Sequence, residues 1–239
     1  MNAIFKKEIK MFFASMEAYI AIIVFFIMNG LILWYIPSDF NIFYNQKASL
    51  LPFFNTAPWI LLILIPAITM KMISTEFNQR TNLILFTKPV KKWDIILAKF
   101  LASLTIGIIC LIPTLIFVYT IYYISDPVGN IDIWELVGSY IGIILLISLY
   151  VSIGLFCSSI SNNNMIAYIL TIIIILLMYI GFNILGENFN LDIFEYLSIK
   201  SHYESISRGV IDSRDLIYFN SITFVFLYFS SIAIEQKNI

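Results

Sequence analysis

The residues with chemically active side chains do not form a known catalytic or metal-binding pattern in this sequence. No glycine is followed by lysine, so the phosphate-binding loop G-x-x-x-x-G-K-[ST] is absent. The single histidine, His202, cannot make a multi-histidine metal site. Ser158, Ser159 and Ser161 have no histidine nearby in the sequence to activate them as nucleophiles. We therefore expect no cofactor, no metal site and no ATP hydrolysis by this chain.

The composition indicates a membrane protein. Hydrophobic residues make up 60 % of the 239 residues and charged residues 12 %, whereas soluble domains are about 45–50 % apolar and about 25 % charged. The mean hydropathy is +0.91. The formal net charge of −1 gives no general attraction to nucleic acid. We therefore predict an all-α integral membrane protein with a single transmembrane domain over residues 1–239.

Six apolar runs are long enough to cross about 30 Å of hydrocarbon as helices. Helices are expected because each backbone N–H and C=O in lipid must be bonded within its own segment, and the runs lack the alternation of a membrane barrel. The first run is long for a secretory signal and no small-x-small cleavage site follows it, which favours a retained helix. The predicted spans are Ala18–Ile36, Ala57–Ile73, Phe100–Ile124, Leu136–Phe156, Met165–Leu185 and Leu216–Ile234.

Lysine and arginine are distributed unevenly between the two sides of these spans. With the N-terminus inside, the inner segments hold ten basic residues and the outer segments four, which predicts cytoplasmic termini. Trp34, Trp59 and Trp134 fall at predicted outer edges, where indole rings prefer the interface. Within the spans, Lys71 is the one ionisable Asp, Glu, Lys or Arg residue. This scarcity argues against a transporter powered by its own proton or ion relay.

The first fifteen residues predict an additional helix outside the spans. Apolar side chains fall near one helical face, and Lys6, Lys7 and Lys10 lie away from its centre. This pattern suits a helix in the inner interface, with its ammonium groups toward anionic headgroups. The alternative is a basic flank that only orients the first span.

Two loops and one glycine pair complete the organisation. Residues 74–99 form the longest cytoplasmic loop, in which the apolar residues 83–86 lie between charges; this suits docking by another protein, or a solvated connector. Residues 186–215 form the longest extracytoplasmic loop, where short helices at the outer surface are expected. Gly138 and Gly142 form G-x-x-x-G, which permits close helix packing either between subunits or within one subunit.

The stretch that begins at Glu76 resembles the cytoplasmic loop of ABC type-2 transporter permeases. That family often reads Glu, then Gly-Thr, then Glu-Leu-Leu-Leu-Thr-x-Pro, then Lys at the third span. In this sequence Arg80 stands in place of the Gly, and Leu83 in place of the second Glu. The matching residues are Glu76, Thr81, Leu85, Thr87, Pro89 and Lys99. Three further segments resemble the gliding-motility-associated permease subgroup: Ala57–Trp59, Leu64–Met70 and Ser205–Asp212.

The resemblance implies a fold, partners and a location. Two permease subunits, identical or different, would pair to form the substrate pathway in the bacterial inner (cytoplasmic) membrane, with both termini in the cytoplasm. Each subunit would engage a separate cytoplasmic ATPase subunit through a coupling helix in the loop, with the interfacial helix beside it. The coupling residues implied are Glu76, Arg80, Thr81, Leu85, Thr87 and Pro89.

Three functional hypotheses follow. The first is the permease subunit of an ATP-driven exporter. The second is a membrane anchor without transport activity, as part of a motility or secretion complex. The third is a membrane-embedded enzyme, for which the polar outer segment with His202, Glu204 and Arg208 is the support.

Overall fold

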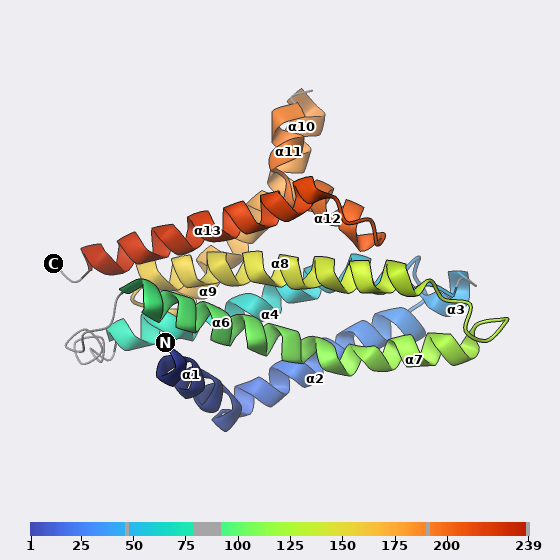
Figure 1. The fold of residues 1–239 in the computed structure, drawn as a ribbon, viewed down its shortest axis with the longest axis horizontal. Helices are drawn as coiled ribbons and strands as arrows, with labels where there is room; N and C mark the ends of the chain where they lie inside the picture. Colours follow the sequence, from blue (N-terminus) through green and yellow to red (C-terminus); the bar gives the residue numbers. More distant parts are fainter. Residues whose placement is uncertain (46–47, 79–91, 190–191, 238–239) are drawn as a thin grey trace.

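The computed structural model describes residues 1–45, 48–78, 92–189 and 192–237. Within these ranges the chain forms helices joined by turns and contains no β-strand (Figure 1). The α-helices are α1 (Asn2–Ala14), α2 (Met16–Gly30), α3 (Ile42–Asn45), α4 (Leu51–Asn78), α6 (Lys92–Leu111), α7 (Leu115–Ile124), α8 (Ile133–Ile160), α9 (Asn164–Leu176), α10 (Phe182–Phe189), α11 (Asp192–Leu197), α12 (Ile199–Ser207) and α13 (Ser213–Gln236). Three short turns of 3-10 or π helix continue them: η1 (Leu31–Tyr35), η2 (Ile112–Thr114) and η3 (Leu177–Gly181).

Six of the described helical segments are long and apolar enough to cross a membrane. They are Met16–Tyr35, Leu51–Asn78, Lys92–Ile124, Ile133–Ile160, Asn164–Gly186 and Ser213–Gln236. The prediction of an all-helical fold with six membrane-spanning helices is thereby confirmed.

The ends of several helices lie beyond the apolar runs. Both ends of the predicted 74–99 loop are helical, because α4 continues to Asn78 and α6 begins at Lys92. A helix does not stop where hydrocarbon stops, since polar residues continue the backbone hydrogen bonds into the headgroup region. Pro113 lies within η2, the 3-10 turn that separates α6 from α7, as expected where a helix loses a backbone donor.

Helix α8 forms the centre of the bundle. In its most apolar stretch 72 % of the residues are buried in the protein, against 22 % for Met16–Tyr35 and for Asn164–Gly186. It contacts α4, α6, α9, α12 and α13. The peripheral helices therefore present broad apolar faces away from the chain's own core, as lipid or a second subunit would require.

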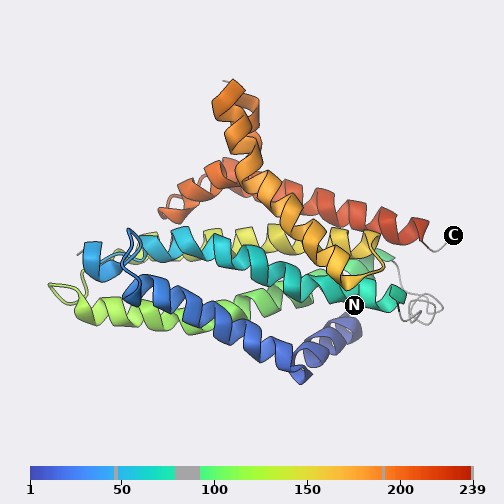
Figure 2. The ribbon, with the colours of Figure 1, turned by 180° about the vertical axis from the view of Figure 1, so that it is seen from behind.

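The bundle has two distinct ends. We call the end that carries α1, the last turns of α4, the first turns of α6 and the last turns of α13 the terminal end, because both chain termini lie there (Figure 1). The opposite end, with η1, α3 and the turn between α7 and α8, is the far end. Helices α10 and α11 project from the side of the bundle (Figures 1 and 2). The chain runs back from them through α12 toward the far end before α13 returns to the terminal end.

Two glycines of α8 face another part of the same chain. A Cβ atom built on Gly138 would lie 2.6 Å from the carbonyl oxygen of Gly209, and one on Gly142 would lie 2.5 Å from a methyl group of Ile206. The absence of side chains at these two positions therefore lets α12 and its following turn approach α8 closely. Gly209 has a φ of +81°, a conformation that favours glycine.

A third glycine of α8 sets the distance between the two central helices. A Cβ atom on Gly154 would lie 2.0 Å from Oγ1 and 2.7 Å from Cβ of Thr69 in α4. Thr69 is fully buried and donates its hydroxyl to the carbonyl of Ile65, so it has no free space into which to turn.

We expect Gly154→Ala to destabilise the protein by about 1–3 kcal/mol, because the added methyl group overpacks the contact between α4 and α8. Thermal unfolding in detergent can be followed with a thiol-reactive fluorophore, since Cys110 and Cys157 are both buried. Gly30→Ala is the matched control, because its Cβ would meet its nearest neighbour, Phe117, at an ordinary 3.7 Å. Equal melting temperatures for the two variants would contradict the packing argument.

Candidate functional site

A buried lysine lies at the centre of the terminal end. The side chain of Lys99 in α6 is 1 % exposed, and its Nζ atom lies 2.9 Å from a carboxylate oxygen of Glu8 and 2.9 Å from one of Glu76. It also donates to the backbone carbonyl of Met72. Three acceptors therefore surround the ammonium group, which matches its three N–H donors.

This arrangement compensates for the loss of water around a charge. The Glu8 side chain is 4 % exposed and that of Glu76 is 17 % exposed. An isolated buried charge is strongly unfavourable, whereas a buried ion with opposite charges and further hydrogen bonds can be accommodated. Lys7, whose Nζ atom is 3.4 Å from Glu76, brings a second positive charge from the surface. We call Lys7, Glu8, Glu76 and Lys99 the ion cluster.

The ion cluster joins three helices that are far apart in the sequence. Glu8 comes from α1, Glu76 from the last turn of α4, and Lys99 from the second turn of α6. Two of these helices flank residues 79–91, because α4 leads into that segment and α6 follows it. A displacement of either flank therefore acts directly on the buried contacts of α1.

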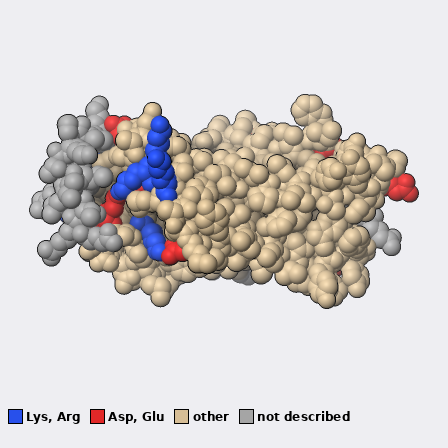
Figure 3. Space-filling model, turned by 90° about the horizontal axis from the view of Figure 1, so that it is seen from below, with Lys and Arg blue, Asp and Glu red and all other residues tan. Residues whose placement is uncertain are grey.

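Further ion pairs surround the cluster at the terminal end. Lys71 of α4 pairs with Glu17 of α2 at 2.6 Å, and Lys92 of α6 pairs with Glu235 of α13 at 3.0 Å. Figure 3 shows the visible lysine and arginine side chains gathered at one end of this face, beside carboxylates, with a long stretch of other residues beyond them and further Asp or Glu side chains at the opposite end. These pairs are exposed and contribute little individually, in contrast to the buried lysine.

A neutral polar seam ties α4 to α8 and α9 beside the ion cluster. The hydroxyl of Ser158 accepts from the backbone N–H groups of Ile73 at 3.1 Å and Ser74 at 3.0 Å, and donates to the carbonyl of Met70. The side chain of Asn164 accepts from the hydroxyl of Ser74. The final turns of α4 are therefore held on both sides, by charges toward α1 and α6 and by hydroxyl and amide groups toward α8 and α9.

The sequence was compared with known proteins. A family model described as "ABC-2 family transporter protein" matches residues 2–234. The chain belongs to the ABC-2 transporter family. It is accordingly a membrane permease component of an ABC transporter, and the family is not itself an ATPase family. The comparison with curated proteins gives no significant match.

The predicted coupling residues of this ABC-2 permease divide into two groups. Glu76 is described, and it is occupied by contacts with Lys99 and Lys7 inside the same chain. The other five lie outside the described residues: Arg80, Thr81, Leu85, Thr87 and Pro89. The three lysines predicted for the interfacial helix, Lys6, Lys7 and Lys10, lie on the exposed side of α1.

Sequence reasoning missed the two most buried members of the ion cluster. The sequence pattern places Lys99 at the family's lysine position at the third span, and it gives no role to Glu8. A signal for Glu8 was present, because Ile4, Glu8 and Phe12 share one face of α1 at a spacing of four residues. A carboxylate in the middle of an apolar helix face requires a buried cation as a partner.

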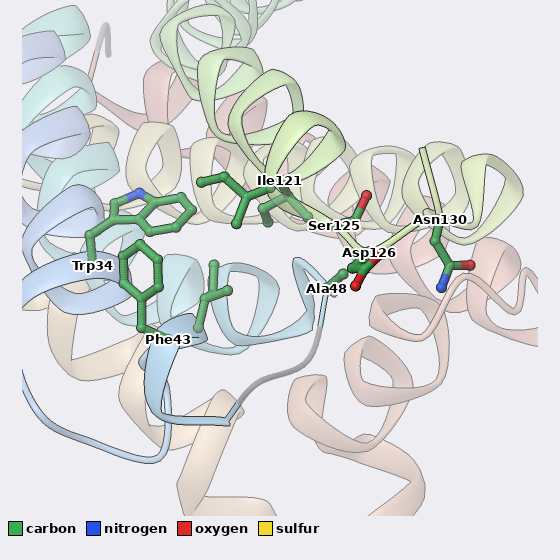
Figure 4. Close-up of a pocket in the computed structure, with 9 residues that line it drawn as sticks. Trp34, Phe43, Ala48, Ile121, Ser125, Asp126 and Asn130 are labelled. Atoms are coloured by element: carbon green, nitrogen blue, oxygen red, sulfur yellow. The ribbon is translucent and has the colours of Figure 1, made fainter. Parts of the chain in front are cut away.

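The far end of the permease contains a partly polar cavity of about 400 Å³ between η1, α3 and the end of α7. Figure 4 shows Trp34 and Phe43 on one side of it and Asp126 and Asn130 on the other. The two aromatic rings pack with their centroids 5.2 Å apart. Asp126 is the one charged residue among the described residues that line this cavity.

The histidine on which the enzyme hypothesis depends, His202, makes contacts that join helices. His202 of α12 lies 2.6 Å from a carboxylate oxygen of Asp215 through Nδ1 and 2.9 Å from the carbonyl oxygen of Tyr196 through Nε2. Its ring also stacks on Tyr218 with centroids 4.0 Å apart. These contacts attach α12 to α11 and α13. Glu204 and Arg208 are not among the hydrogen-bond partners of this histidine within the described part of the chain.

We expect Lys99→Met to destabilise the permease by about 3–5 kcal/mol, because it leaves the carboxylates of Glu8 and Glu76 buried without a cation. The triple variant Lys99→Met, Glu8→Gln and Glu76→Gln should recover part of the loss, since no unpaired charge remains. Thermal unfolding with the thiol-reactive fluorophore measures both effects. Lys92→Met is the matched control, because its partner Glu235 is exposed to solvent. A Lys99→Met protein as stable as this control would contradict the role of the ion cluster.

Proposed function

We propose that this ABC-2 permease is the membrane-spanning subunit of an exporter that is driven by a separate cytoplasmic ATPase. In this proposal residues 79–91 form the ATPase contact, and α1 lies beside it at the inner membrane surface. The absence of a phosphate-binding loop from the sequence supports ATP hydrolysis by a separate subunit. Two copies, or this chain and a related one, would together enclose the substrate pathway.

The buried ion cluster is the observation that supports this proposal most strongly. A loop that receives force must be attached to the spans it moves, because a freely solvated connector would absorb the displacement. Here the two helices that flank residues 79–91 are joined to each other through Glu76 and Lys99, and both are joined to α1 through Glu8. The three helices would therefore respond to the ATPase as one body. ATP would shift the population of inward-open and outward-open states only by binding one of them more tightly.

The orientation, membrane and process are parts of the same proposal. The excess of lysine and arginine in the segments at the terminal end supports a cytoplasmic location for both termini, in a bacterial inner membrane. A role in gliding motility is supported by the resemblance of Ala57–Trp59, Leu64–Met70 and Ser205–Asp212 to that subgroup. A non-transporting anchor would share the family fold but would need no link between the loop and the spans.

We expect Arg80→Ala combined with Leu85→Ala to reduce co-purification of the ATPase at least several-fold, because both side chains belong to the proposed docking loop. The melting temperature of the isolated permease should stay unchanged, in contrast to that of Lys99→Met. Arg214→Ala at the opposite end of the bundle is the control and should retain the partner. Undiminished recovery of the ATPase with the double loop variant would argue against docking through residues 79–91.

The proposed orientation predicts opposite labelling of two engineered cysteines. Lys88→Cys should react with a membrane-impermeant maleimide only after the cells are permeabilised, because it belongs to the proposed cytoplasmic segment between α4 and α6 in the sequence. Val128→Cys should react in intact cells, since Val128 is 63 % exposed in the turn between α7 and α8. The native cysteines are buried and give little background. The reverse labelling pattern would overturn the orientation and, with it, cytoplasmic coupling.

A further inference from the structure

A second far-end cavity, lined by basic and aromatic side chains, is not used by the proposed coupling mechanism. It measures about 310 Å³ and lies between the first turns of α4 and one face of α12. We propose that it binds the phosphoryl headgroup of an anionic membrane lipid. The proposal goes beyond the export function, since it requires only that the chain is inserted in a bilayer.

The first wall of the cavity is a single face of α4. Leu51, Asn55 and Trp59 follow one another at a spacing of four residues and all line it. Ile63 continues the same face and is 57 % exposed, and Trp59 is 48 % exposed. The cavity therefore opens beside an apolar surface along which an acyl chain can lie, with an indole ring at the boundary, where such rings prefer to lie.

The second wall is the face of α12 that carries the charges. Lys200, Glu204 and Arg208 line the cavity, again at a spacing of four residues. Lys200 lies 3.6 Å from Glu204, and the two side chains are 41 % and 48 % exposed, so this pair holds the lysine only weakly. With two cations and one anion, this wall has a net positive charge.

Two donor groups in the cavity have no partner within the described residues. Arg208 makes no ion pair there, and the side-chain amide of Asn55 makes no hydrogen bond. A guanidinium group presents paired N–H donors that match the oxygens of a phosphate. An amide donor and a lysine nearby complete a set of donors suited to an oxyanion.

The cavity is held open by fixed contacts behind it. Tyr203, on the same face of α12, donates its hydroxyl to the carbonyl of Phe54 at 2.7 Å. Burial, together with the nearby Tyr179, raises the pKa of Tyr203 well above its ordinary value, so the hydroxyl stays protonated and able to donate. Tyr179 packs edge-on against Trp59, with ring centroids 5.7 Å apart. The basic residues are therefore carried by a wall that does not depend on the ligand.

The far-end cavity at Asp126 provides an internal comparison. Its polar residues include Asp126, and no lysine or arginine is among the described residues that line it. It is the larger of the two at about 400 Å³, so volume does not distinguish the binding site. The choice of an anionic ligand rests on the charges of Lys200 and Arg208.

Quenching of Trp59 by brominated lipids tests the proposal. The full-length protein would carry Trp34→Phe, Trp93→Phe and Trp134→Phe, so that Trp59 is the single reporter, and thermal unfolding would verify its fold. Phosphatidylglycerol or phosphatidylcholine, each brominated on the acyl chain, is titrated into mixed micelles. We expect phosphatidylglycerol to give the same quenching at a mole fraction about fivefold to 25-fold lower than phosphatidylcholine. This range follows because each cation at a membrane surface contributes a factor of about five to the binding of an anionic lipid.

Substitution of the basic residues tests their role. Arg208→Gln and Lys200→Gln should each reduce this preference about fivefold, and the double variant should quench equally with both lipids. Arg214→Gln is the matched control, because Arg214 is an exposed arginine that does not line the cavity. Equal quenching of the starting protein by the two lipids would overturn the proposal. So would a preference that survives the double substitution, or one that Arg214→Gln reduces as much as Arg208→Gln.

A soluble phosphate ester distinguishes a lipid from a free phosphate. Glycerol 1-phosphate cannot quench Trp59, but it competes for the same donors, and in excess it should relieve the quenching by brominated phosphatidylglycerol. This measurement needs no substitution in the cavity. If glycerol 1-phosphate raises the melting temperature while brominated phosphatidylglycerol shows no preference, the ligand is a free phosphate ester and the lipid assignment is wrong.

Discussion

The burial of one ammonium group organises the terminal end of this permease. Lys99 could not remain charged in an apolar helix bundle without compensation. Its two carboxylate partners come from α1 and α4, so the three helices can be separated only by exposing or isolating buried charges. The ion cluster therefore has a stronger structural consequence than the exposed ion pairs around it, because breaking it leaves an uncompensated charge.

This constraint also changes the interpretation of Glu76. As part of a loop motif, a glutamate before a docking segment suggests contact with a partner protein. In the folded chain its carboxylate is bonded to Lys99 and approached by Lys7, and its side chain is mostly buried. A contact with the ATPase at this residue would compete with the ion cluster. In the proposed coupling, residues beyond Asn78 would therefore make the contact with the ATPase, and Glu76 would hold the end of α4 from which they extend.

The general architecture could be predicted from the sequence because it depends on properties that are additive along the chain. Runs of about 20 apolar residues specify spans regardless of what each span contacts. Pairwise contacts are not additive in this way. Lys99 reads as a flanking cation because sequence cannot reveal that the helix extends to Lys92 and that this face meets α1. Similarly, G-x-x-x-G indicated close packing, but Gly138 faces Gly209 in the turn after α12 and Gly142 faces Ile206 in the short helix α12, and neither faces a second long helix.

The two ends of the bundle differ in the kind of contact that attaches their helices. At the terminal end, buried charge links α1, α4 and α6, and a polar seam links α4 to α8 and α9. At the far end, the contacts that join α12 to the central helices are neutral: Tyr203 donates to the carbonyl of Phe54 in α4, and Ser139 of α8 donates to the carbonyl of Ser207. A displacement imposed at the terminal end would thus move several helices together, while relative motion of α12 against α4 and α8 would separate no buried charges among these contacts. Proteins that change conformation concentrate such motion where few buried contacts must be broken. In the proposed exporter, force would therefore enter where buried charges join the helices, and motion at the far end would rearrange neutral contacts of α12 with α4 and α8.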